Sequence, residues 1–160
     1  MISLTDDNRR SYPPHPTHLG LPLTSAEQEQ LWNACPFWHF RERLVLALLL
    51  EMGLRPREVC ALTWQDIQPG ALSVLGKGGQ KRIVLLGNET KLAMDGFVAC
   101  YFSRDRDEHE SLLALDELRL IEHIRVLGKR AGLDRPLSVH DLRRAAILRA
   151  RAALRKGSGA

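Results

Sequence analysis

Cysteine is scarce in these 160 residues, with only Cys35, Cys60 and Cys100 present. Their number is odd, and no pair has the Cys-x-x-Cys spacing of a metal or redox site. We therefore expect reduced thiols, no bound metal and a cytoplasmic location. No motif indicates a cofactor. The loop Gly76-Lys77-Gly78-Gly79 lacks the Gly-Lys-Ser/Thr ending of a nucleotide-binding loop and leads into a strand pattern, so nucleotide binding is not expected.

Long uncharged apolar segments are also missing, since no stretch reaches the roughly 18 residues that a membrane-spanning helix needs. The longest apolar run, Leu44 to Leu50, follows Arg41, Glu42 and Arg43 and precedes Glu51, which is typical of a buried helix. The first ten residues are polar and mixed in charge, without a secretory signal pattern. We expect no association with a membrane.

Positive charge is unevenly distributed along the chain. The formal net charge of +4 and the pI near 9.3 permit nucleic-acid binding without proving it. From Arg143 to Lys156 no residue is acidic, whereas acidic residues gather between Asp105 and Glu110. A basic C-terminal stretch indicates a one-sided phosphate-binding surface, and a solvated helix face is the alternative interpretation.

Local signals predict an α+β fold, mainly helical with a small antiparallel β-hairpin or sheet. Thr24-Ser25-Ala26-Glu27 is a capping box that begins a helix ending near Pro36. The hairpin is predicted from two short apolar runs, Leu72 to Leu75 and Lys81 to Leu86, around the glycine-rich turn. Whether a third strand accompanies the hairpin stays open. Further helices are predicted over residues 41–52, 56–62, 89–102 and 111–131, and from His140 or Asp141 to about Arg155.

The proline-rich start and the glycine-rich end set the predicted domain limits. Residues 1–23 contain four prolines and Gly20, so we predict an extended or disordered arm. Residues 24–156 form one domain, and residues 157–160 form a flexible tail.

Four basic residues occur on three separate motifs: Arg55 in Gly53-Leu54-Arg55, Lys77 in the hairpin turn, and His140 with Arg143 in His140-Asp141-Leu142-Arg143. Fixed cations stabilise the charge that develops on a reacting phosphodiester. Arginine suits this role because its planar fork matches two phosphate oxygens. Each motif alone has an ordinary structural explanation, such as a surface arginine, an exposed hairpin lysine or a capping histidine.

Taken together, the three motifs resemble those of the tyrosine recombinase (phage integrase) family, across about residues 24–150. The resemblance implies a tyrosine-recombinase catalytic-domain fold. It implies that Arg55 and Arg143 clamp the scissile phosphate, that Lys77 protonates the leaving 5′ oxygen, and that His140 assists proton transfer. It also implies that Glu58 supports the site structurally, although its first-turn position also explains it as a helix-stabilising carboxylate, which is the interpretation we prefer. Double-stranded DNA is the implied partner, with a full-length recombinase or a second copy as further possibilities. Other basic residues expected to contact DNA are Lys81, Arg82, Arg144, Arg149 and Arg151.

The chain also departs from the family pattern. Arg144 stands where the family usually has histidine, and Arg149 and Arg151 fall where an apolar helix face is expected. The family's tyrosine nucleophile lies beyond the position at which this chain ends, and neither Tyr12 nor Tyr101 matches it. We therefore expect a domain that binds DNA without cutting it, with an accessory or regulatory role.

Two alternatives remain for the function. The chain is either a truncated catalytic domain of an active recombinase, which its Gly-Ser-Gly-Ala end favours, or a protein-interaction domain that does not bind DNA. The added arginines of the last helix favour the DNA-binding module, because truncation alone would not introduce them.

Overall fold

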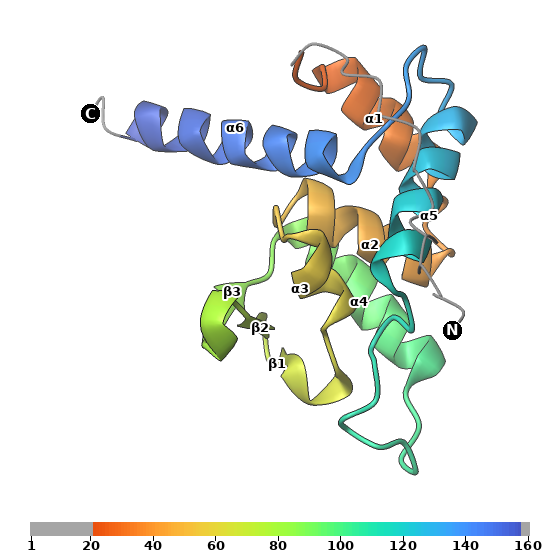
Figure 1. The fold of residues 1–160 in the computed structure, drawn as a ribbon, viewed down its shortest axis with the longest axis vertical. Helices are drawn as coiled ribbons and strands as arrows, with labels where there is room; N and C mark the ends of the chain where they lie inside the picture. Colours follow the sequence, from red (N-terminus) through yellow and green to blue (C-terminus); the bar gives the residue numbers. More distant parts are fainter. Residues whose placement is uncertain (1–20, 158–160) are drawn as a thin grey trace, which may run out of the picture.

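Helix α2 (Phe40–Leu50) is the centre of the fold in the computed structural model, which describes residues 21–157. Every residue from Leu44 to Leu50 is buried, which confirms the buried helix predicted from the apolar run. Helix α2 packs against α3 (Pro56–Cys60), α4 (Asn88–Tyr101) and α6 (Val139–Gly157), while α1 (Ser25–Ala34) packs on α5 (Glu117–Arg130) (Figure 1). No helix in this described range has both the length and the apolar character needed to cross a bilayer.

The small sheet is antiparallel and has the order β1 (Ile67–Gln68), β2 (Ala71–Leu75), β3 (Lys81–Leu85). The predicted hairpin is confirmed as β2 and β3, and the third strand precedes it. A 3-10 turn over Lys77–Gly79 joins β2 to β3, with φ of 80° at Gly78 and 78° at Gly79. Residues other than glycine rarely adopt a positive φ, so the turn favours glycine at both positions.

The start of helix α1 follows the capping box read from the sequence. The Thr24 hydroxyl accepts from the backbone N–H of Glu27 at 3.1 Å, and the Glu27 carboxylate accepts from the N–H of Thr24 at 2.7 Å. Leu23 is buried, and the Leu21 carbonyl accepts from Arg135 at 3.2 Å. Residues 1–20 of the predicted arm and residues 158–160 of the predicted tail lie outside the described residues, and Gly157 is the last residue of α6.

The predicted helix over 111–131 is wrong in its first six residues, because α5 begins at Glu117. Ser111 instead forms a β-bridge with Thr63, and the N–H of Leu112 donates to the Leu62 carbonyl at 2.8 Å. These long-range contacts hold the segment extended along the loop that follows α3. Asp116 is the N-cap of α5, and its side chain accepts from the N–H of Arg119.

The end of α2 fixes the start of α4 and so the exit from the hairpin. The Glu51 carboxylate accepts from the backbone N–H of Thr90 at 2.7 Å and from the Thr90 hydroxyl at 2.6 Å. A carboxylate suits the N-terminus of a helix, where backbone N–H groups lack partners. Gly87 lies so close that an added Cβ would stand 2.2 Å from the Glu51 carboxyl carbon. The segment after β3 is therefore tied to the end of α2.

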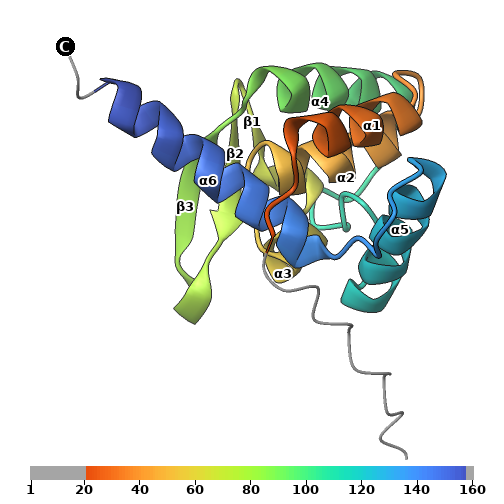
Figure 2. The ribbon, with the colours of Figure 1, turned by 90° about the horizontal axis from the view of Figure 1, so that it is seen from above.

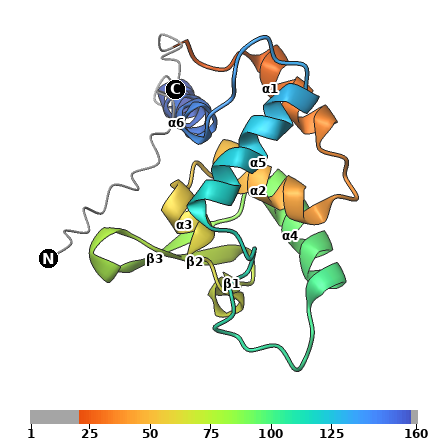
Figure 3. The same cartoon turned by 45° about the vertical axis from the view of Figure 1, so that its right-hand side comes forward.

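The buried residues of helix α6 all lie in its first half. Leu142, Ala145 and Ala146 are buried, whereas every residue from Leu148 to Gly157 is exposed. The second half of α6 extends away from the body, on the same side of the molecule as the β2–β3 hairpin (Figures 2 and 3).

Candidate nucleic-acid interface

Arg55 lies at a tight turn between α2 and α3. Gly53 has φ of 66°, and an added Cβ there would lie 3.1 Å from Cβ of Ala146 on α6, so glycine meets both a backbone and a packing requirement. Leu54 is buried and its N–H donates to the Leu48 carbonyl at 3.0 Å. Arg55 is the N-cap of α3, and its side chain is exposed. The turn therefore fixes the Arg55 backbone while its guanidinium faces solvent.

Arg143 on α6 reaches this same turn. Its guanidinium donates from Nη1 to the carbonyl oxygen of Gly53, two residues before Arg55. The start of α6 is fixed by Ser138 and Asp141, because the Asp141 carboxylate accepts from the Ser138 N–H at 2.9 Å and from its hydroxyl at 2.7 Å. The fold thus brings together the first and last motifs, which lie about ninety residues apart in the sequence.

Basic side chains line an open cavity along α6. Its volume is about 350 Å³. Residues spaced three or four apart share one face of a helix, which explains how His140, Arg144 and Arg151 come to line one groove. The lining residues are His140, Arg143, Arg144, Ile147, Leu148 and Arg151.

Lys77 does not line this cavity. It is exposed in the turn of the hairpin, and the hairpin lies on the side of the molecule toward which α6 extends (Figure 2).

Arg149 points in another direction from the groove residues. Its guanidinium donates to the carbonyl of Leu50, the last residue of α2, and to the Gln28 side chain at 3.4 Å. A cation at the C-terminus of a helix interacts favourably with the unpaired carbonyls there. These contacts give Arg149 a structural role in attaching α6 to the body.

Lys81 and Arg82 form ion pairs with buried carboxylates. Arg82 Nη1 lies 2.6 Å from Glu58 Oε1, and Lys81 Nζ lies 2.8 Å from Asp66 Oδ1. Burial favours a raised pKa for the Glu58 carboxyl, but the Arg82 hydrogen bond, the Arg55 N–H and the charge of Arg143 outweigh it and hold that pKa below its usual value. Burial is likewise outweighed at Asp66, whose pKa is lowered by Lys81 and Thr63.

Several other basic residues form no ion pair with a carboxylate of the described part of the chain. Among residues 21–157, none of the following forms an ion pair with Asp or Glu: Arg55, Lys77, Arg143, Arg144 and Arg151. The same range holds no group of three His, Cys, Asp or Glu residues placed to bind a metal ion. The surface that includes α6, the Arg55 turn and the hairpin tip therefore carries several basic side chains without an ion-pair partner in residues 21–157.

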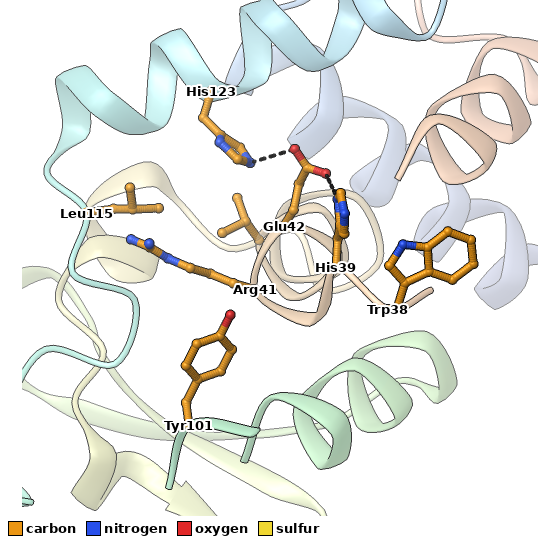
Figure 4. A pocket seen from close by; sticks show the side chains of 8 residues that line it. Trp38, His39, Arg41, Glu42, Tyr101, Leu115 and His123 are labelled. Atoms are coloured by element: carbon orange, nitrogen blue, oxygen red, sulfur yellow. Dashed lines mark hydrogen bonds and ion pairs between the residues drawn. The ribbon is translucent and has the colours of Figure 1, made fainter. Parts of the chain in front are cut away.

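A second pocket lies elsewhere, between the start of α2, the end of α4 and α5 (Figure 4). The Glu42 carboxylate lies between two histidines of this pocket, with Oε2 3.4 Å from His39 Nδ1 and Oε1 3.7 Å from His123 Nε2. Burial lowers the pKa of His123 against the opposing attraction of Glu42. Tyr101, the one tyrosine within the described part of the chain, lines this pocket.

Glu58, Lys81 and Arg82 were named from the sequence but their ion pairs were missed, as were the contacts of Ser138 and Asp66. The Ser138-x-x-Asp141 spacing was visible as a cap before a helix. The pairings of Glu58 with Arg82 and of Asp66 with Lys81 join residues 24 and 15 positions apart, and no local signal identifies them.

Comparison with known proteins places these features in a family. Residues 22–153 match the phage integrase family. The tyrosine recombinase XerA of Saccharolobus solfataricus is 29% identical over 124 residues, which cover 76% of this chain and 40% of that protein. A crystal structure of a XerA recombinase superposes with a TM-score of 0.74 at 28% identity, covering 91% of this chain and 53% of the other. The structure of lambda integrase residues 75–356 bound to DNA has a TM-score of 0.58 at 24% identity, covers 78% of this chain and 49% of the other, and is similar in fold. The chain thus spans about half or less of the length of these proteins.

Proposed function

The chain belongs to the phage integrase family, and on that basis we propose that it binds duplex DNA by holding a backbone phosphate among Arg55, Lys77, His140 and Arg143. Arg144 and Arg151 extend the contact along the phosphate backbone. The observation that carries this proposal is the convergence of Arg143 on the Arg55 turn, beside a groove whose arginines have no carboxylate partner in residues 21–157. A DNA-bound structure of similar fold supports the choice of partner.

Each proposed residue has a role that its chemistry allows. Arg55 and Arg143 offer paired N–H donors to the non-bridging oxygens and stay charged at any physiological pH. His140 lies one turn before Arg144 on the groove face, where a ring N–H can donate a hydrogen bond to a phosphate oxygen. Lys77 lies in the hairpin turn, from which its ammonium group can donate to a phosphate of a bound duplex.

We assign the 160-residue chain a binding role without strand cleavage, in an accessory or regulatory capacity. Covalent cleavage in this family needs a tyrosine hydroxyl beside the phosphate, and Tyr101 lines the other pocket. A second candidate is a catalytic part of an active recombinase, supported by matched relatives that are tyrosine recombinases and extend well beyond the matched part.

The salt dependence of DNA binding tests the proposed function. Affinity for a duplex of arbitrary sequence should fall as salt rises, with a log–log slope of about −0.9 for each phosphate neutralised. Fluorescence anisotropy with a labelled duplex, between about 50 and 200 mM salt, measures the slope. Absence of binding even at low salt would contradict both DNA-based functions and favour a protein-interaction domain.

A further inference from the structure

One buried carboxylate connects the Arg55 turn to the hairpin that carries Lys77. Glu58 Oε2 accepts from the backbone N–H of Arg55 at 2.8 Å, while its Oε1 accepts from Arg82 Nη1 at 2.6 Å. Glu58 is only 5% exposed. Because both oxygens of a single rigid group are used, a shift of Arg82 is transmitted to the turn that holds Arg55.

A second ion pair holds the strand from its other face. Successive strand residues point to opposite faces, so Lys81 and Arg82 leave β3 in opposite directions. Lys81 binds Asp66 at 2.8 Å, and Asp66 is itself fixed by the N–H of Thr63 at 2.9 Å and its hydroxyl at 2.8 Å. Beyond these two residues, Ile83 and Leu85 of β3 are exposed, whereas Val84 packs against the core. The ion pairs therefore add to the pairing with β2 just where the strand leaves the turn.

The Arg82 side chain also lies next to the residue that precedes Lys77. An added Cβ at Gly76 would stand 3.5 Å from Arg82 Nη1. Gly76 closes the turn by donating its N–H to the Gln80 carbonyl at 2.7 Å. Arg82 thus links the base of the Lys77 turn directly to Glu58.

We propose that Arg82, assisted by Lys81, is a positioning residue that holds the Lys77 turn at a fixed place relative to Arg55, and that neither Lys81 nor Arg82 binds phosphate. The proposal rests on the DNA-binding function proposed above. A phosphate that captured Arg82 would leave Glu58 charged and buried without its cation, which is unfavourable. Arg144 and Arg151 face no such competition, since neither has a carboxylate partner in residues 21–157.

A double-mutant cycle between Lys77→Gln and Arg82→Gln tests this role. One phosphate contact contributes about tenfold in affinity near 0.1 M salt, so Lys77→Gln alone should weaken binding by about tenfold. Arg82→Gln should cause a similar loss by displacing Lys77, and the double variant should be no weaker than either single variant. A loss of about 100-fold in the double variant, with the salt slope flatter by about 1.8, would show two independent phosphate contacts and overturn the proposal.

Glu58→Gln gives an outcome of opposite sign for the two interpretations. If Arg82 contacted phosphate, removal of its negative partner would free it and strengthen DNA binding. If Arg82 positions the hairpin, Glu58→Gln should weaken DNA binding as Arg82→Gln does. Arg82→Lys should bind DNA more tightly than Arg82→Gln, because the lysine ammonium can still pair with Glu58. Stronger binding by Glu58→Gln would contradict the positioning role.

Amide signals of the turn glycines test the inference without DNA. In two-dimensional NMR spectra, Arg82→Gln should shift or broaden the signals of Gly76, Gly78 and Gly79, whereas Arg144→Gln should leave them unchanged. Unchanged glycine signals in a folded Arg82→Gln protein would overturn the positioning role even if the wild-type chain binds DNA. Failure of the wild-type chain to bind DNA would instead reject the proposed function while this measurement still decides the role of Arg82.

Discussion

Reversing the charge of Arg144 and Arg151 together should weaken binding to duplex DNA by about 100-fold or more near 0.1 M salt. Each lost phosphate contact is expected to cost about tenfold in affinity at this salt, and the introduced carboxylates add repulsion. The log–log salt slope should also become flatter by about 1.8, which corresponds to two phosphates. Titrations of wild type and Arg144→Glu/Arg151→Glu at several salt concentrations measure both quantities.

The matched control is Arg119→Glu/Lys129→Glu on α5. Both residues are exposed, lie outside the groove, and change the net charge by the same amount. This variant should bind DNA within a few-fold of wild type. Thermal unfolding should be nearly unaffected in Arg144→Glu/Arg151→Glu, because surface substitutions away from caps and buried contacts have small effects on stability. The control should lose a little stability, because Arg119 pairs with the N-cap Asp116 and Lys129 lies in the last turn of α5, so binding is compared at a temperature at which both variants are folded. If both double variants lost the same DNA affinity, binding would depend on overall charge, which would contradict a specific interface along α6.

Incubation of the chain with DNA should yield no covalent protein–DNA adduct. A phosphotyrosyl link requires a hydroxyl aligned with the held phosphate. Tyr101 lies at the end of α4, packed 4.7 Å from the Phe97 ring and in the pocket with Arg41 and His123 (Figure 4). Helix α6 and the hairpin lie on another side of the molecule (Figure 1). Water attack at the held phosphate would at most nick DNA slowly, without linking it to protein.

Denaturing electrophoresis after incubation with supercoiled plasmid detects such an adduct, with an active tyrosine recombinase on its own site as the positive control. Tyr101→Phe and Tyr12→Phe are the informative variants, although Tyr12 lies outside the described residues. An adduct that forms with the wild-type chain and disappears in either variant would contradict the binding role and establish a complete enzyme.

Local sequence signals predicted most of the fold. The Thr24 capping box, the apolar run of α2 and the glycine turn of the hairpin each act over a few neighbouring residues, and all three appear in the structure. The predicted start of the helix that includes α5 was wrong, because the bridge between Ser111 and Thr63 overrides the helical pattern. Periodicity has no information about a contact of that range.

In the candidate interface, too, the sequence identified the basic residues but not the contacts that they make. Family resemblance selected Arg55, Lys77, His140 and Arg143, and the fold brings Arg143 to the Arg55 turn. Sequence position alone grouped Arg82 with Arg144 and Arg149 as DNA-binding residues. Their surroundings differ, because Arg82 pairs with Glu58, Arg149 attaches to the end of α2, and Arg144 faces an open groove. The charges that neutralise a basic residue come from distant segments, so they become visible only in the folded chain.

We propose that Arg55 and Arg143 hold one DNA phosphate between them, and a crystal structure of the chain with a duplex would show this contact. We expect a backbone phosphate within hydrogen-bonding distance of both guanidinium groups, about 2.7–2.9 Å from nitrogen to oxygen, with α6 and the hairpin along the same duplex. A duplex bound on the α5 face, or one that leaves Arg55 and Arg143 without a shared phosphate, would contradict it.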